Sequence, residues 1–294
     1  MANIHEIKGR INGVQDTKKI TNAMYLIAST KMRKAKEEME RSRPHFEAIR
    51  VEVKRIFRTV KDLESPYFYP PDRSKFVEGT YGILVITADK GLAGAYNINV
   101  IKETQKLLRS NADTRLFVVG EFGRQYFRRR NIPIEEDFHF SSEHPTLDLA
   151  RKITVALLEE YNRGRLKKIF VVYTSLENRL SAKATSNRLL PFHRDYFGDK
   201  KKEEPITQEF DFVPSVNEVL EMVMDSYIAG FIHGALVDSF TAEQNSRMNA
   251  MSSANQNADD LLSDLSQEYN RRRQEVITGE IIEVSAGAMA QKRK

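Results

Sequence analysis

The feature that most constrains this chain is its last 80 residues, which follow a helical pattern with almost nothing to interrupt it. No proline follows Pro214, and the glycines of the stretch 215–290 are single and far apart: Gly230, Gly234, Gly279 and Gly287. Ser215, with Glu218 three residues later, has the pattern of a helix-capping box. One helix over 215–290 would be about 114 Å long. A helix this long and this polar needs a partner to pack against.

The first 60 residues offer that partner. Apolar residues recur there at spacings of three and four, as in the seam of a coiled coil: Ile4, Ile7, Ile11 and Val14, then Ile20, Met24, Ile27 and Ala28. Pro44 is expected to kink or interrupt this helix. The two ends therefore predict an antiparallel coiled coil, in which the longer last helix extends beyond the first.

Charge supports this pairing. Formal net charge is +7 over residues 1–60 and −5 over residues 215–294, while the whole chain carries +5. A basic end could bind nucleic acid. The basic residues are spread around the helix without interleaved aromatic residues, so attraction between the two ends is the favoured interpretation.

The middle of the chain, residues 77–212, has the alternating pattern of a small α/β domain with a parallel sheet. Strands are predicted at Tyr81–Thr87, Arg115–Val119 and Lys168–Thr174, and helices near 97–109, 121–130 and 146–162. Residues 178–187 are polar and are expected to form a loop or an irregular edge. A final strand is possible at 206–212.

Little in the sequence points to chemistry. Cysteine is absent, which excludes disulfides, thiolate metal sites and a cysteine nucleophile. The six histidines lack metal-binding spacing and are expected at the surface, so neither a metal nor a cofactor is predicted. The loop Asp89–Gly94 follows the first strand as a phosphate-binding turn would, but it matches no complete nucleotide-binding motif, and a tight turn is the favoured interpretation. No apolar run near 18 residues, signal peptide or transit peptide is expected.

Several motifs resemble one known family. The C-terminal run Ile277–Ala288 fits the pattern I-T-x-E-x-x-[DE]-x-x-x-G-A at every fixed position, and this pattern ends the γ subunit of F-type ATP synthases. The segments Thr17–Met24, Lys31–Ala35, Gly91–Gly94 and Arg247–Met251 are similar to the same family, in the same order. Ala95 departs from the family, which often has a glycine there.

The resemblance implies a fold and a function. The fold would be α/β with long helices: an antiparallel coiled coil of residues 1–60 and 215–290 and an inserted Rossmann-like domain at 77–212. The function would be that of a central rotor shaft, without catalysis of its own, inside a ring of α and β subunits and joined to the ε subunit and the membrane ring of c subunits. The residues implied at partner contacts are Met24, Lys31, Arg33, Arg247, Gln274, Thr278 and Glu280.

Two other function classes remain as alternatives. One is a nucleotide-binding α/β protein with coiled-coil dimerisation arms, and the other is a coiled coil that binds nucleic acid through its basic end. The resemblance favours the function of a rotor and implies that the chain does not bind nucleic acid. With no cysteine and no transit peptide, it also implies a bacterial complex on the cytoplasmic side of the inner or plasma membrane.

Overall fold

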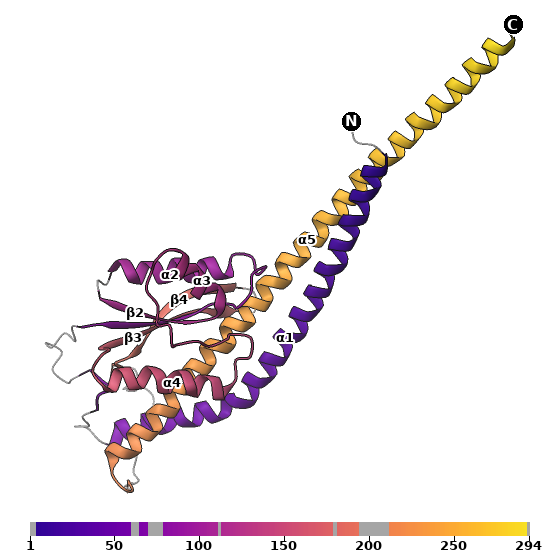
Figure 1. The fold of residues 1–294 in the computed structure, drawn as a ribbon. Coiled ribbons are helices and arrows are strands. Elements are labelled where there is room, and N and C mark those ends of the chain that lie inside the picture. Colours follow the sequence, from indigo (N-terminus) through magenta and orange to yellow (C-terminus); the bar gives the residue numbers. More distant parts are fainter. Residues whose placement is uncertain are drawn as a thin grey trace. The chain divides into compact units, whose positions relative to one another are not determined.

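The computed structural model describes residues 4–59, 65–69, 79–110, 113–178, 181–193 and 212–292 (Figure 1). They fall into two compact units. The sheet unit is Thr30–Ser246, and the helix-pair unit is Met1–Ser29 together with Arg247–Lys294. The elements in chain order are α1 (Ile4–Thr59), β1 (Tyr81–Ile86), α2 (Tyr96–Ser110), β2 (Thr114–Val119), α3 (Glu121–Arg129), α4 (Leu147–Asn162), β3 (Lys168–Asn178), β4 (Ser181–Leu190) and α5 (Val216–Lys292).

Both long helices form as predicted. The main-chain N–H of Glu218 donates to the Ser215 hydroxyl at 3.3 Å, and that hydroxyl lies 3.0 Å from the Glu218 carboxylate, so the capping box starts α5. Pro44 does not interrupt α1, which continues through it to Thr59. Pro44 is exposed, so water can bond the carbonyl group that its ring leaves without a partner.

The sheet has four strands in the order β2-β1-β3-β4. The first three are parallel and β4 pairs antiparallel to β3. The three predicted strands are thus confirmed. The prediction of a loop at 178–187 is wrong, because most of that stretch belongs to β4. The alternative of an irregular edge is nearer, since β4 is an edge strand whose pairing has two register shifts. The strand considered at 206–212 lies almost entirely outside the described residues.

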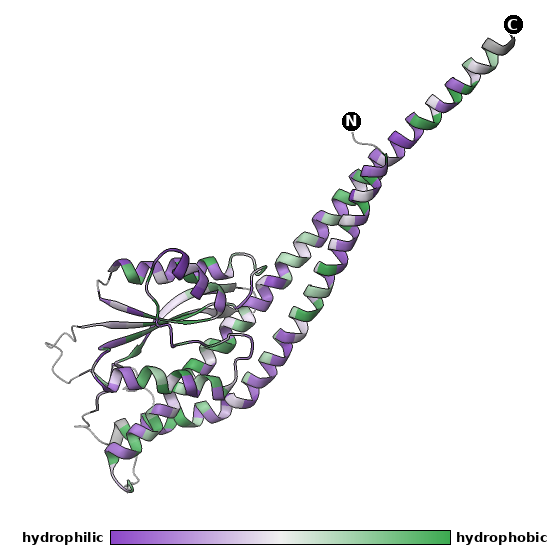
Figure 2. Ribbon diagram, viewed as in Figure 1, coloured by the Kyte–Doolittle hydropathy of each residue, from purple (hydrophilic) through white to green (hydrophobic). Residues whose placement is uncertain are grey.

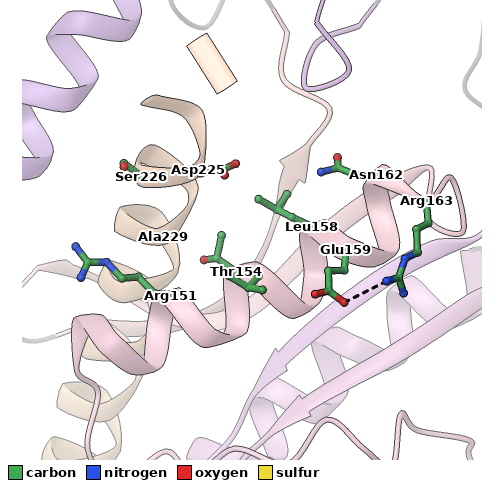
Figure 3. A pocket seen from close by; sticks show the side chains of 10 residues that line it. Arg151, Thr154, Leu158, Glu159, Asn162, Arg163, Asp225, Ser226 and Ala229 are labelled. Carbon is green, nitrogen blue, oxygen red and sulfur yellow. Dashed lines mark ion pairs between the residues drawn. The ribbon is translucent and has the colours of Figure 1, made fainter. Parts of the chain in front are cut away.

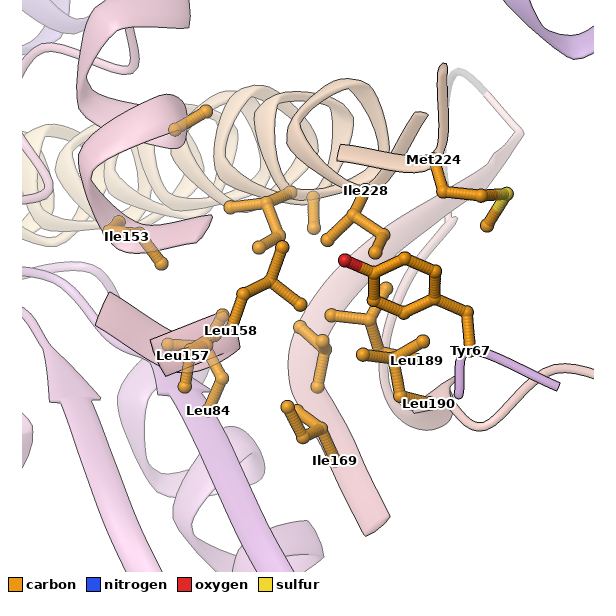
Figure 4. Close-up of a cluster of buried hydrophobic side chains, with 14 of the residues drawn as sticks. Tyr67, Leu84, Ile153, Leu157, Leu158, Ile169, Leu189, Leu190, Met224 and Ile228 are labelled. Atoms are coloured by element: carbon orange, nitrogen blue, oxygen red, sulfur yellow. The ribbon is translucent and has the colours of Figure 1, made fainter. Parts of the chain in front are cut away.

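Helices cover both faces of the sheet. One face packs against α2 and α3 through buried side chains such as Val85, Ile101 and Phe127. The other face packs against α4, the start of α5 and the end of α1, with Leu84, Leu157 and Ile228 among its members (Figure 4). The alternation of strand residues between these two faces produces a three-layer domain.

Within the sheet unit, α1 and α5 approach each other closely at Gly230. A β-carbon built on Gly230 would lie 2.2 Å from a ring carbon of Phe46, so only glycine fits there without a shift. The Phe46 ring also lies 5.8 Å from the imidazole of His233. His233 is only 1% exposed, so the prediction that the histidines lie at the surface is wrong for this residue. Burial lowers the pKa of His233 and favours its neutral form.

Within the helix-pair unit, α1 and α5 are antiparallel. Lys18 pairs with Asp259, and Thr21 donates a hydrogen bond to Asn255, so residues that follow one another on α1 meet residues in descending order on α5. The predicted stripe is confirmed at Ile7 and Ala28, which are buried.

The prediction that the stripe faces α5 is wrong at two positions. Ile20 is 61% exposed and Ile27 is 56% exposed. The contact with α5 instead passes through Lys18 and Thr21, whose polar side chains take the places expected for apolar ones.

One described helix, α5, is long and apolar enough by composition to cross a membrane, which corrects the expectation that no such run exists. Of its most apolar window, 56% is buried inside the fold. Burial of this kind is also found in the core helix of a protein that does not enter a membrane, so this feature alone does not indicate a span.

Candidate partner interface

The seven residues expected at partner contacts do not form one cluster. Lys31 and Arg33 belong to the sheet unit, and the other five belong to the helix-pair unit. In the helix-pair unit, Met24 is half-buried and Arg247 is buried, whereas Gln274, Thr278 and Glu280 are exposed. The register of α1 against α5 places Met24 level with about residue 252 of α5, within two turns of Arg247.

The three exposed positions belong to a tip of α5 beside which the described part of the chain places no other helix. By the same register, Ile4 lies level with about residue 274. Arg272 is the last α5 side chain before Gly279 that is even partly covered. Residues 273–292 therefore form a tip about 30 Å long. The five predicted contact residues of the helix-pair unit thus occupy two separate levels of it.

Large apolar side chains are exposed at both levels, and the sequence analysis did not single them out as contacts. Ile20, Leu26 and Ile27 surround Met24 on α1, each more than half exposed. On the tip, the exposed apolar residues are Val276, Ile277, Ile281, Ile282, Val284 and Met289. Figure 2 shows these hydrophobic segments recurring along the end of α5. Contiguous apolar surface of this kind marks interaction sites. A search for apolar residues outside the coiled-coil stripe would have found Leu26 and the residues of the tip, but not Ile20 and Ile27, which were assigned to that stripe.

The crevice where an α/β sheet of this topology would bind a ligand is filled by the chain itself. Strand order reverses at β1, so the crevice lies between the carboxyl ends of β1 and β3. There α5 contributes Ser239, whose hydroxyl accepts a hydrogen bond of 3.1 Å from the main-chain N–H of Thr174. One turn further on, Ala242 packs against Ala88 and Ala93. This filled crevice argues against the nucleotide-binding alternative.

The loop Asp89–Gly94 is a tight turn, in agreement with the favoured interpretation. Leu92 and Gly94 have positive φ angles of 60° and 53°, which fold the chain back on itself before α2. The Asp89 carboxylate accepts a hydrogen bond of 3.0 Å from the N–H of Glu121 at the start of α3. A carboxylate thus occupies a helix N-terminus that would otherwise attract a phosphate.

A pocket of about 530 Å³ lies between α4 and α5 (Figure 3). Leu158 and Ala229 form the apolar floor of the pocket. Its rim includes Glu159 and Arg163, whose carboxylate and guanidinium groups lie 3.8 Å apart. Asp225 lines the pocket and accepts a hydrogen bond of 3.0 Å from the Tyr67 hydroxyl. Burial raises the pKa of Asp225. None of the seven predicted contact residues lines this pocket, and no sequence motif indicated it.

Comparisons with known proteins cover the whole chain. A family model described as ATP synthase matches residues 3–290. The ATP synthase gamma chain of Acetivibrio thermocellus is 35% identical over 99% of this chain and 100% of its own length. That of Caldanaerobacter subterraneus subsp. tengcongensis is 38% identical, over 96% of this chain and 98% of its own length.

Solved structures agree in fold. A chain of the mitochondrial ATP synthase of Euglena gracilis, in the structure of OSCP, F1 and c-ring, aligns with a TM-score of 0.66 at 16% identity, over 98% of this chain and 94% of its own. A chain of the central stalk and c-ring of the Tetrahymena thermophila enzyme aligns with a TM-score of 0.58 at 22% identity, over 80% of this chain and 99% of its own. Together with the full-length sequence matches, the antiparallel helix pair and the inserted four-stranded domain establish that this chain belongs to the gamma chain family of ATP synthases.

Proposed function

We propose that this chain is the central rotor of an F-type ATP synthase. It couples ion flow through a membrane ring of c subunits to ATP synthesis or hydrolysis in a surrounding ring of α and β subunits. The chain itself makes and breaks no bond. Its contribution is mechanical, because its contacts favour one state of a catalytic partner over another.

The observation that carries this proposal is the exposed apolar surface at two levels of the helix pair. Both levels include residues that the family resemblance implies at partner contacts: Met24 at one and Thr278 at the other. A shaft inside a ring needs contacts at more than one height to stay centred. Most of the stability of a helix in a protein comes from packing of its apolar face, so a surrounding collar would give the tip its partner.

The proposed partners follow from the same family. The α and β subunits would contact the helix pair, and the ε subunit and the c-ring would contact the sheet unit. The chain would then lie peripherally on the cytoplasmic side of a bacterial membrane, held there through the complex. The bacterial origin of its relatives supports this location.

Reconstitution of the complex tests the proposal. Purified α and β subunits are assembled with and without this chain, and the ATPase rate is measured. The complete complex in vesicles is then assayed for ATP-driven ion pumping. We expect rapid ATPase and pumping only when the chain is present. If an assembly that lacks this chain hydrolyses ATP and pumps ions as well as one that contains it, the rotor role is disproved.

Met24→Lys tests the contact level on α1. Lysine can extend its ammonium group to solvent from a half-buried position, so the helix pair should still fold. The added charge would meet the partner at each turn, and we expect ion-driven ATP synthesis to fall more than helix content. Asn22→Lys adds the same charge at an exposed position two residues away and serves as the control. Normal synthesis by the Met24→Lys complex would count against this contact.

A further inference from the structure

Asp89 joins three segments at the carboxyl end of the sheet. Besides the N–H of Glu121, its carboxylate accepts hydrogen bonds from the Ser141 hydroxyl at 2.6 Å and from the Ser142 N–H at 2.9 Å. Hydrogen bonds to a charged acceptor are stronger than those between neutral groups. The segment that carries Ser141 is therefore fixed to the end of β1.

Glu143 extends this network to α1. Its N–H donates to the Ser141 hydroxyl at 3.1 Å, which continues the chain of bonds from Asp89. Its carboxylate lies 2.9 Å from the ammonium group of Lys90 and 3.8 Å from that of Lys31 on α1. The hydrogen bond from Lys90, followed by the charge of Lys31, lowers the pKa of Glu143 and keeps it ionised.

The turn after Asp89 makes the matching contact with α5. Ala93 and Tyr96 are buried against Ala242. A β-carbon on Gly94 would lie 3.9 Å from the carbonyl oxygen of Ser246, so the turn follows the surface of α5 for a full helical turn. The loop therefore contacts α5 through apolar packing, and it is linked to α1 through Glu143, which pairs with Lys90 of the loop and with Lys31 of α1.

The apolar contacts between α1 and α5 beside this loop are small. Ala35 and Met39 of α1 face Val237 and Phe240 of α5. Apolar contact resists separation of two helices but is not directional. An ion pair joins two particular groups, so the pair of Lys31 with Glu143 adds a point of attachment that opposes rotation of α1 about its own axis.

We propose that Glu143 is a positioning residue that holds α1 in fixed rotation relative to the α/β domain, through Lys31 and Lys90. This inference rests on the rotor function proposed above. A rotor transmits torque only if its two helices turn together with the domain that carries them. In this assignment Lys31 acts within the chain, whereas the family resemblance implied that it contacts a partner.

The test compares Glu143→Gln with Glu47→Gln in the reconstituted complex. Glu47 is a matched control, because it pairs with Arg43 on the same helix at 2.8 Å and, among the residues that the structure describes, forms no ion pair with another element. The readout is the number of ions pumped per ATP hydrolysed. Ion pairs of this exposure are worth up to about 1 kcal/mol, so we expect slippage to rise by up to about fivefold in Glu143→Gln. We expect an unchanged ratio in Glu47→Gln.

Charge exchange separates positioning from other roles. Glu143→Lys alone should lower the pumping ratio, and adding Lys31→Glu together with Lys90→Glu should restore it, because both pairs re-form with reversed charges. Failure of that rescue would overturn the assignment of Lys31 to Glu143. If Glu143→Gln pumps like the parent complex, the inference is wrong and the rotor function stands. If the parent complex itself does not pump, the proposed function fails instead. If Glu143→Gln does not assemble, Lys31→Gln gives the same comparison.

Discussion

Two glycines on one helix give opposite predictions for the same substitution. Gly230 and Gly234 are one turn apart on α5, and both face α1. Alanine stabilises a helix by about 1 kcal/mol relative to glycine when its methyl group has room. At Gly234 the new β-carbon would lie 3.6 Å from the terminal methyl of Met39, an ordinary contact. We therefore expect Gly234→Ala to stabilise the chain by about 1 kcal/mol.

At Gly230 the same methyl group has no room. It would lie 2.2 Å and 2.5 Å from two carbons of the Phe46 ring. Carbon atoms pack at about 3.5–4.0 Å, so the ring or the helix would have to move by more than 1 Å. Overpacking of this kind costs about 1–3 kcal/mol, which outweighs or cancels the gain in helix propensity. We expect Gly230→Ala to be less stable than Gly234→Ala by about 1–3 kcal/mol.

Urea unfolding of the full chain, followed by circular dichroism, measures this difference through the midpoint and the slope. A second variant identifies the cause. Phe46→Leu removes the ring edge, so Gly230→Ala should cost less in that background than alone, as a double-mutant cycle would reveal. Equal stabilisation by alanine at both glycines would refute the close approach of α1 to α5.

Three further predictions follow from buried polar groups. Burial raises the pKa of Asp238 to about 6 from its ordinary 3.8, so the folded chain binds this proton more tightly than the unfolded one. The contribution of Asp238 to stability should therefore be greatest below about pH 4 and be lost as pH rises through about 6; Asp238→Asn should stabilise the chain relative to the parent by about 1–3 kcal/mol at pH 7 and not at pH 3.5 in thermal unfolding. Arg124 is 2% exposed and donates to three main-chain carbonyl oxygens at 2.6 Å, 3.1 Å and 3.4 Å. Arg124→Met should cost about 2–4 kcal/mol in urea unfolding, whereas Arg128→Met at the surface should change stability little. Ser239→Ala leaves the N–H of Thr174 without its acceptor and should cost about 1–3 kcal/mol; faster amide exchange at Thr174 would locate the effect.

Much of the fold could be predicted because its signals are local. The absence of breakers after Pro214 and the capping pattern at Ser215 predicted α5, and short apolar runs predicted three strands. The fourth strand could not be predicted in this way. Most of β4 is polar, and its pairing with β3 decides its conformation, which is a tertiary effect that local propensity does not contain.

The partner interface was harder to predict. Two adjacent faces of α1 carry apolar residues at coiled-coil spacing, one that includes Ile20 and Ile27 and one that includes Thr21. The sequence alone does not select between these two faces. The hydrogen bond from Thr21 to Asn255 shows which face of α1 packs against α5, and its acceptor lies 234 residues further along the chain. The same holds for His233, whose burial comes from packing against Phe46 rather than from any pattern around it.

The antiparallel helix pair also has a consequence for biosynthesis. Lys18 and Asp259 are 241 residues apart, so the first helix leaves the ribosome long before its partner exists. At the usual rates of translation this interval is about 12–50 seconds. The four strands of the sheet unit are synthesised during that time, although the unit is complete only at Ser246, and the first 29 residues must wait as a nascent segment without a stable partner. Their excess of lysine and arginine would keep this waiting segment soluble through charge repulsion until α5 is complete.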